Sequence, residues 1–276
     1  MTTATMPVRE PRARFADLVA AEWMKLWSLR STIWSLLVCA LAVVAFNAGT
    51  AYDTYRYWPG DDAGFAEQFV RDGMPLQQAF TSNASMVLIL GTGAIGALTV
   101  VGEYSTGMIR TTFAAVPARR SVTAAKAVVV AALMTGFGTV VAWGSFALTQ
   151  AILSGREAGV PIDHPGAPRL IVASALLAPV CALTGMALGV ILRHVAGTMT
   201  SIVVALLLLP IAVTEGRHWS AVLNHTLIHS AWQRLTSVHA TGGEYPWTTT
   251  GAWTVYAAWT VATITLTVTA VHRRDQ

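Results

Sequence analysis

Six long apolar runs constrain the fold of this chain more than any other feature of its sequence. Each reaches the roughly 20 residues that an α-helix needs to cross about 30 Å of hydrocarbon, and the third is longer. Only 12% of the 276 residues are charged, against roughly 25% in an average soluble domain. We therefore expect an all-α integral membrane protein with six transmembrane helices, at approximately 31–51, 79–101, 122–153, 169–192, 197–215 and 250–271.

The sequence before the first run divides into two parts. Residues 1–14 are polar and basic and contain proline, which is typical of a disordered tail. Residues 15–30 are expected to form an amphipathic helix that lies in the membrane surface, with tryptophan at headgroup depth. A cleaved signal peptide is the less favoured alternative for the first run, because that run is longer than a typical signal sequence core. The apolar stripe of the surface helix consists of Phe15, Leu18, Val19, Trp23, Leu26 and Trp27.

Lysine and arginine predict the orientation, because cytosolic loops carry an excess of them. With the N-terminus in the cytosol, 12 of the 18 basic residues lie inside, whereas nine of the 14 acidic residues lie outside. We therefore expect both ends of the chain, including the tail 272–276, in the cytosol. Residues 216–249 form the last outer segment. We expect an amphipathic helix there that lies in the outer leaflet or re-enters it, with helical spacing of Trp219, Val222, Leu223, Thr226 and His229.

The apolar runs contain no ionisable side chain at mid-depth, which argues against ion-coupled carriers and voltage sensors. Lys126 and Glu215 lie near the ends of runs, where long side chains reach the interface. The stretch GTGAIG at 91–96 lacks the lysine of a phosphate-binding loop and lies inside an apolar run. We interpret it as a surface for helix packing. Its small residues are Gly91, Gly93, Ala94, Gly96 and Ala97.

No group of residue types points to catalysis or to a metal centre. His225 and His229 would share a helix face, but two histidines are an incomplete metal site. Cys39 and Cys181 fall inside apolar runs and are interpreted as small apolar residues. A net charge of +4 could by itself suggest nucleic acid or anionic lipid as a partner. In a membrane protein, however, the distribution of charge between the two sides is more informative than the sum. We expect no enzymatic activity from this chain by itself, no metal site and no nucleic-acid partner.

One polar segment, GEYSTGMIRTTFAAVPARR at 102–120, separates two of the most apolar runs. Ser105 suits a helix N-cap, and Pro117 forces the residue before it out of the helical region. The pattern predicts a short amphipathic helix over 103–117, beneath the membrane. Its apolar face holds Ile109, Phe113 and Val116.

The alternative for this segment is an ordinary inner loop that is basic because it faces the cytosol. That reading accounts for Arg119 and Arg120. It does not account for Glu103 at the exit from the membrane, nor for the capped amphipathic turns before the arginines. We therefore favour a docking role for the helix.

Two motifs resemble a known family. They are AEWMKLWSLRSTIW at 21–34, before the first span, and GEYSTGMIRTTFAAVPARRSVTAAK at 102–126, after the second. Both resemble membrane subunits of type-2 ATP-binding-cassette transporters, especially those of high-GC actinobacteria. The layout of the whole chain is similar as well. The resemblance implies a type-2 exporter-like permease in a bacterial cytoplasmic membrane.

The resemblance also implies a partner that supplies the energy. In such systems the helix after span two docks into a separate cytosolic ATPase, which binds ATP and Mg, so this chain would hold no cofactor. Two ATPase copies and a second permease subunit, identical or homologous, complete the transporter. The implied docking positions are Glu103, Tyr104, Thr106, Met108, Ile109, Arg110, Thr112 and Phe113. The surface helix would pack beside them with Glu22, Trp23, Lys25 and Arg30.

A transport pathway between the two subunits is implied too, lined by spans two and five. Its mostly apolar lining with a few hydroxyls favours a hydrophobic or amphipathic cargo, such as a drug, a lipid or an antimicrobial peptide. The alternatives are a mechanical or sensor subunit that moves no cargo, and an enzyme that acts on lipids. The implied lining positions are Ser85, Met86, Ile89 and Gly93 on span two, and Thr198, Ser201, Val204, Leu208 and Pro210 on span five.

Overall fold

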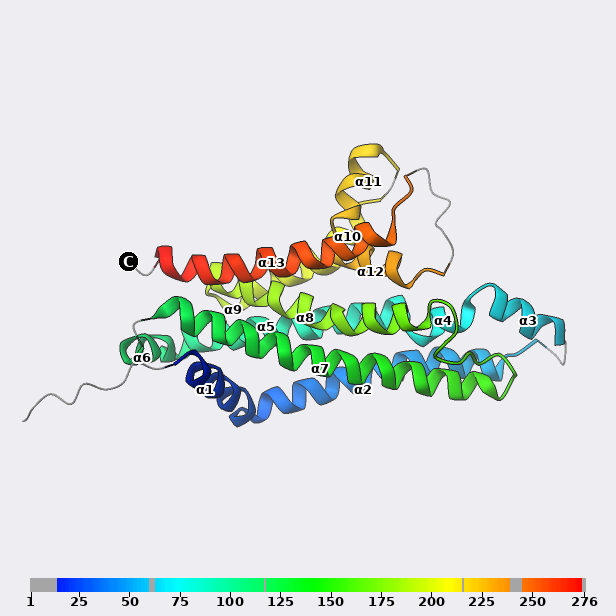
Figure 1. Ribbon diagram of the computed structural model, residues 1–276, viewed down its shortest axis with the longest axis horizontal. Helices are drawn as coiled ribbons and strands as arrows, with labels where there is room; N and C mark the ends of the chain where they lie inside the picture. Colours follow the sequence, from blue (N-terminus) through cyan, green and yellow to red (C-terminus); the bar gives the residue numbers. More distant parts are fainter. Residues whose placement is uncertain (1–13, 60–62, 117, 215, 239–244, 275–276) are drawn as a thin grey trace, which may run out of the picture.

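The structure is a computed structural model that describes residues 14–59, 63–116, 118–214, 216–238 and 245–274, and every regular element in these ranges is helical. The helices form an elongated bundle (Figure 1). Five of them are long enough and apolar enough to cross a membrane, as expected of a multi-pass all-α membrane protein. These five segments are Arg30–Arg56, Met74–Thr106, Arg119–Ser154, Ala167–Leu192 and Val195–Ala212.

Four long helices contain the first four predicted spans and differ from them mainly at their ends. They are α2 (Arg30–Arg56), α5 (Ser82–Thr106), α7 (Arg119–Ser154) and α8 (Ala167–Leu192). Helix α5 begins three residues later than expected, because Thr81 acts as its N-cap and accepts a hydrogen bond from the amide of Ala84. The other three helices begin before the predicted spans.

The connection between α2 and α5 contains two helices that the sequence did not predict, α3 (Ala63–Arg71) and α4 (Met74–Ala79). An aromatic cluster of Trp58, Phe65 and Phe69 packs beside them, with ring centroids 4.9–6.1 Å apart. Burial of these rings stabilises the folded connection. The connection is therefore largely helical over its described residues.

The fifth predicted span consists of three consecutive pieces, α9 (Val195–Ile202), the π-helix η1 (Val203–Leu208) and α10 (Leu209–Ala212). Pro210 lacks an amide hydrogen and cannot complete a regular helical bond to the carbonyl four residues earlier. The π-helical turns lie directly before it, at the position where the α-helical pattern is interrupted. The helix ends three residues before the expected limit at 215.

The sixth predicted span forms α13 (Thr249–Arg274), which runs along the bundle beside α8 (Figure 1). It carries eight threonines, which lower its mean hydropathy, and it is not among the five apolar helices above. Several of these hydroxyls donate to carbonyls of the same helix, as Thr260 does to Tyr256 at 2.8 Å and Thr267 to Thr263 at 2.6 Å. A sixth crossing therefore stays a prediction.

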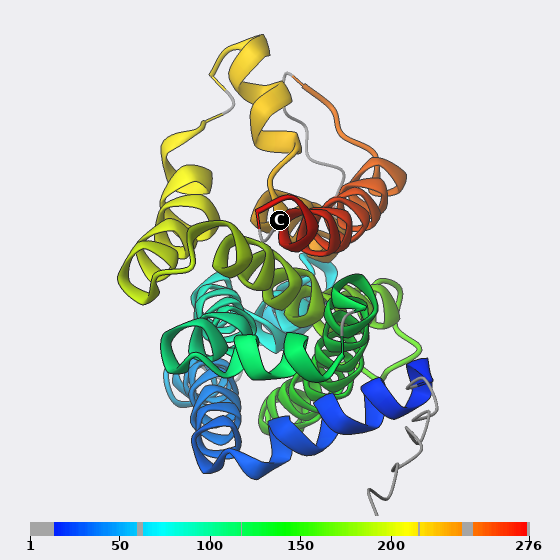
Figure 2. The same ribbon diagram turned by 90° about the vertical axis from the view of Figure 1, so that its left-hand side faces the viewer.

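Helix α8 occupies the middle of the bundle, where it packs against α5, α7 and α13 (Figure 2). The backbones of α5 and α8 approach so closely that a Cβ atom on Gly185 would lie 1.9 Å from the carbonyl oxygen of Gly93. A Cβ atom on Gly96 would lie 2.0 Å from the carbonyl oxygen of Ala182. The predicted packing surface is confirmed at Gly93 and Gly96 of α5.

Helix α1 (Phe15–Ser28) lies across the end of the bundle and is joined to α2 through the extended Leu29 (Figure 2). Its predicted stripe divides between two faces. Leu18 and Leu26 are buried, and Leu18 packs against the first turns of α7. Phe15, Trp23 and Trp27 are exposed. The single apolar face that the spacing predicted is wrong, because α1 has a protein-facing side and a second, exposed apolar side.

The segment that was predicted to lie outside contains α11 (His218–His225) and α12 (Ile228–Thr236), not one helix. Leu227 between them has an extended backbone. His225 and His229 therefore lie on different helices, and the predicted common face of Trp219 through His229 is wrong. Helix α12 packs against α8 and α13.

His229 makes the stability of the α11–α12 region sensitive to pH. Its ring is buried beside Trp232, and burial lowers its pKa from about 6.5 to about 4. The unfolded chain therefore binds a proton between these values that the folded chain does not. We expect stability to fall as pH drops from 6.5 towards 4, by at most about 1.4 kcal/mol per unit. Thermal unfolding of wild type and His229→Gln at pH 7 and pH 5 measures this; an equal pH response in both proteins would contradict it.

Candidate functional site

A short separate helix, α6 (Met108–Ala115), follows α5 at the end of the bundle where α1 lies (Figures 1 and 2). Gly107, at a φ of +74°, ends α5 and begins α6. The predicted start of this helix is wrong, because α5 continues through Thr106. Ser105 does not act as an N-cap; its hydroxyl donates to the carbonyl of Gly102 at 3.0 Å.

The implied docking positions are therefore divided between two helices. Glu103, Tyr104 and Thr106 belong to the last two turns of α5. The α6 positions are Met108, Ile109, Arg110, Thr112 and Phe113, of which the side chains of Arg110 and Phe113 lie outside the part that the structure describes.

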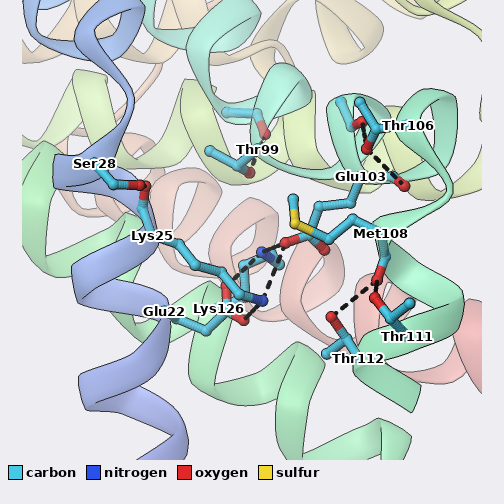
Figure 3. Close-up of polar contacts among 12 residues, drawn as sticks. Glu22, Lys25, Ser28, Thr99, Glu103, Thr106, Met108, Thr111, Thr112 and Lys126 are labelled. Atoms are coloured by element: carbon cyan, nitrogen blue, oxygen red, sulfur yellow. Dashed lines mark hydrogen bonds and ion pairs between the residues drawn. The ribbon is translucent and has the colours of Figure 1, made fainter. Parts of the chain in front are cut away.

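The side chains of α6 that the structure describes leave part of the helix open to a partner. Met108 is exposed, and Ile109 is half-buried. The hydroxyls of Thr111 and Thr112 both donate to the carbonyl of Met108, at 2.8 and 3.0 Å (Figure 3). These bonds satisfy the threonine hydroxyls within the helix and leave an exposed surface centred on Met108.

Four charged side chains from three helices meet beside α6, and we call them the ion cluster (Figure 3). Glu22 and Lys25 come from α1, Glu103 from α5 and Lys126 from α7. The Lys126 ammonium bonds Glu22 and lies 2.8 Å from Oε1 of Glu103. The Lys25 ammonium lies 2.6 Å from Oε1 of Glu22 and 3.3 Å from Oε1 of Glu103. Each lysine therefore bridges both carboxylates.

Three members of the ion cluster are buried, Lys25 is partly exposed, and the cluster is electrically balanced. Glu22, Glu103 and Lys126 are 3%, 7% and 8% exposed. Two carboxylates and two ammonium groups give a formal charge of zero, as buried ionic groups require if none is to be left uncompensated. Burial lowers the pKa of Lys25, but its hydrogen bond to Glu22 and the charges of both carboxylates outweigh burial, so that the pKa is raised overall. Lys25 is therefore protonated at neutral pH.

Helix α6 contacts the surroundings of the ion cluster through Ile109. A cavity of about 20 Å³ is lined by Ile109, by Tyr104, and by Glu103 and Lys126 of the cluster. Its volume suits about one water molecule. A displacement of α6 would therefore reach the buried charges through a single layer of side chains.

A second contact joins the end of α5 to the turn between α8 and α9. The guanidinium carbon of Arg193 lies 4.7 Å from the ring centroid of Tyr104, which is a cation–π distance. Arg193 has a φ of +56°, and it ends α8. The connecting residues between spans four and five are therefore attached to the same end of α5 as the ion cluster.

The surface-helix positions have different environments. Glu22 and Lys25 enter the ion cluster, whereas Trp23 is exposed and its ring lies 5.8 Å from that of Trp27. Arg30 is the exposed first residue of α2.

The implied pathway positions do not share one surface in the single chain. Helix α5 contacts α9 and η1, and a Cβ atom on Gly93 would lie 3.3 Å from both Ile202 and Leu206. The positions buried in this interior are Ser85, Ile89, Gly93 and Thr198. The exposed ones are Val204 and Leu208. Those of intermediate exposure are Met86, Ser201 and Pro210.

The pairing of Glu22 with Lys126 is the feature of this site that the sequence analysis missed. Lys126 was expected to extend to the interface, because it lies near the end of a span, but the structure buries it against Glu22 and Glu103. A signal was present, because opposite charges stand in the helix before the first apolar run, at the end of the second run and at the start of the third. Charges at such positions are costly unless they pair with one another.

Neither protein-family models nor curated proteins match this chain. Its function must therefore be argued from the chemistry of the site and from the two sequence motifs.

Proposed function

We propose that this chain is the permease subunit of an ATP-binding-cassette transporter, driven by a separate ATPase that docks on α6. The observation that supports this proposal most directly is the buried ion cluster beside α6. It joins α1 to the inner ends of α5 and α7, two helices long and apolar enough to cross a membrane.

The ion cluster is suited to transmit force. Separating a buried ion pair leaves uncompensated charges, which costs about 3–5 kcal/mol when one partner is lost. The three helices joined by Glu22, Glu103 and Lys126 are therefore expected to move together. An ATPase that displaces α6 would press on Ile109 and so on this unit, and α5 and α7 would tilt as a pair.

The proposed pathway lies between two permease subunits, along α5 and the α9–η1–α10 segment. The interrupted hydrogen bonding before Pro210 makes that segment the one most easily bent. Its exposed apolar residues, Val204 and Leu208, suit a hydrophobic or amphipathic cargo.

We further propose that both chain ends and α6 face the cytosol of a bacterial cell. The described ends of the chain and α6 lie at the same end of the bundle, which supports this (Figure 1).

The proposed orientation predicts one-sided labelling of Thr106→Cys. Thr106 is exposed, and the two native cysteines are buried, so that background labelling is low. A membrane-impermeant maleimide is expected to label this variant in inverted vesicles but not in intact cells. Gln68→Cys, exposed on α3 at the opposite end, is the control and should label only in intact cells. Labelling of Thr106→Cys from outside would overturn the orientation.

Docking on α6 predicts that Met108→Asp releases the ATPase. A carboxylate at the exposed centre of an apolar contact must be desolvated on binding, so we expect at least about a ten-fold loss of affinity. Capture of the ATPase by purified wild-type and variant chains in detergent measures this. Gln68→Asp introduces the same charge at the other end and should bind normally. Equal capture by all three chains would show that α6 is not the docking site.

Cargo-dependent ATP hydrolysis separates this function from that of a mechanical or sensor subunit. In proteoliposomes that contain the chain and its ATPase, a permease should hydrolyse ATP faster when a hydrophobic cargo is added. Hydrolysis that is indifferent to every cargo, yet depends on Met108, would favour the mechanical alternative.

A further inference from the structure

The outer part of the molecule contains a cavity of about 470 Å³ between α4, the start of α5, α12 and the residues just before α13. This volume lies in the range of cavities that hold small-molecule ligands. No residue of the ion cluster lines this cavity. The proposed coupling function does not use it.

Aromatic rings form much of the cavity wall. Trp232 packs edge-on against Phe80, with ring centroids 5.9 Å apart, and its indole nitrogen donates to the hydroxyl of Ser174. Trp247 is stacked on His225 at 4.5 Å. These rings are held in place by packing, so they offer fixed apolar surfaces to a ligand.

Two arginines converge on one residue of the wall, Ser237. Arg234, which lines the cavity, donates to the Ser237 hydroxyl at 3.0 Å, and Arg169 donates to the Ser237 carbonyl at 2.6 Å. Neither guanidinium forms an ion pair with a carboxylate of the described residues. The Nε of Arg169 is buried without a hydrogen-bond acceptor there. The cavity wall therefore carries the positive charge of Arg234, and the charge of Arg169 lies behind it at Ser237.

Amide side chains of the cavity wall add further hydrogen-bonding capacity. Gln77 and Gln233 line the cavity, and their side chains make no hydrogen bond within the described ranges. Helix α11, which contributes Asn224 and His225 to the wall, also carries exposed apolar residues, Trp219 at 64% and Val222 at 53%. A ligand that placed an anionic group at the arginines could extend an apolar part along this surface.

We infer that this cavity binds an amphiphile with an anionic, phosphate-type headgroup. The headgroup contacts Arg234, with Arg169 adding positive charge behind Ser237, and the aromatic wall contacts the part of the ligand next to the headgroup. This inference does not depend on docking of an ATPase, because the binding site belongs to the chain alone.

The test is binding of short-chain lipids to the purified chain in nonionic detergent. Dihexanoyl phosphatidylglycerol, dihexanoyl phosphatidylcholine and inorganic phosphate are titrated separately by calorimetry. Charge-assisted hydrogen bonds of the kind expected here favour the anionic lipid over the zwitterionic one by about ten-fold or more. Equal binding of the two lipids, or no binding of either, would overturn the inference. If inorganic phosphate binds as tightly as phosphatidylglycerol, the site is one for a free anion and the amphiphile is ruled out.

Variants identify the residue responsible. Arg234→Gln should lower the affinity for phosphatidylglycerol to that for phosphatidylcholine, while Arg234→Lys should keep part of the preference because the charge remains. Arg217→Gln removes an exposed arginine of the same outer segment, outside the cavity wall, and should bind as wild type does. Because Arg234 also donates to the carbonyl of Trp247, retained binding of phosphatidylcholine by Arg234→Gln shows that its cavity is intact. The assignment would be refuted if Arg234→Gln kept the full preference for phosphatidylglycerol over phosphatidylcholine, or if Arg217→Gln lost that preference to the same extent.

Discussion

Lys126→Met is expected to destabilise the chain by about 3–5 kcal/mol, because it leaves two buried carboxylates with Lys25 as their one remaining cation. The first structural consequence should be release of α1, which Glu22 and the packing of Leu18 attach to α7. Thermal unfolding in detergent measures the stability. Limited proteolysis within α1 measures its release.

A double-mutant cycle shows whether the loss comes from charge and not from packing. Glu22→Gln together with Lys126→Met leaves Lys25 and Glu103 as a neutral pair, so the double variant should be less destabilised than the two single changes added together. Arg120→Met, an exposed position in the first turn of α7, is the matched control and should change stability by less than about 0.5 kcal/mol. The role of the ion cluster would be contradicted if the losses of stability from the two single changes added up to that of the double variant, or if Lys126→Met were as stable as the control.

Gly185→Ala is expected to have the second large effect. The new Cβ atom would lie 1.9 Å from the Gly93 carbonyl oxygen, which is backbone and cannot rotate away. Helices α5 and α8 would have to separate along the centre of the bundle. Overpacking of a core commonly costs about 1–3 kcal/mol, and we expect this change to reach or exceed the upper value because the clash is with backbone.

Gly136→Ala is the matched control on α7, since a Cβ atom there would have nothing within 4 Å. Because alanine favours the helix over glycine by about 1 kcal/mol, this control should be unchanged or slightly more stable. The fraction of monodisperse protein after extraction and the thermal midpoint both report the difference. Equal stability of the two variants would mean that α5 and α8 do not approach as closely as described.

The long helices could be predicted from the sequence because membrane-spanning segments are recognisable from their length and hydropathy. Small residues likewise located the close face of α5, as Gly93 and Gly96 show. Which helix packs on which face was not predictable, because apolar positions around a helix such as α8 are nearly equivalent in the sequence. The close approach of Gly185 to Gly93 is therefore known only from the structure.

The pairing within the ion cluster could not be predicted from the sequence for the same reason. Glu22 is separated from Lys126 by 104 positions, and nothing in the local pattern joins them. Glu103 stood out as an unexplained acid at the end of an apolar run, but its partners were not identifiable. Amphipathic spacing also misplaced the helix ends near Ser105 and Leu227. Gly107 interrupts the helix in the first case, and Leu227 is extended in the second, where packing of α12 on α8 and α13 competes with a continuous helix.

The central claim is that this chain takes its energy from an ATPase bound at α6, and purification of the chain from its native membrane tests it most directly. The account predicts that a protein with a phosphate-binding loop copurifies in a one-to-one ratio with wild type and is lost from Met108→Asp, and that the chain alone transports nothing. The account would be contradicted by a wild-type chain that purifies without such a partner and by itself transports a solute with an ion gradient as the energy source.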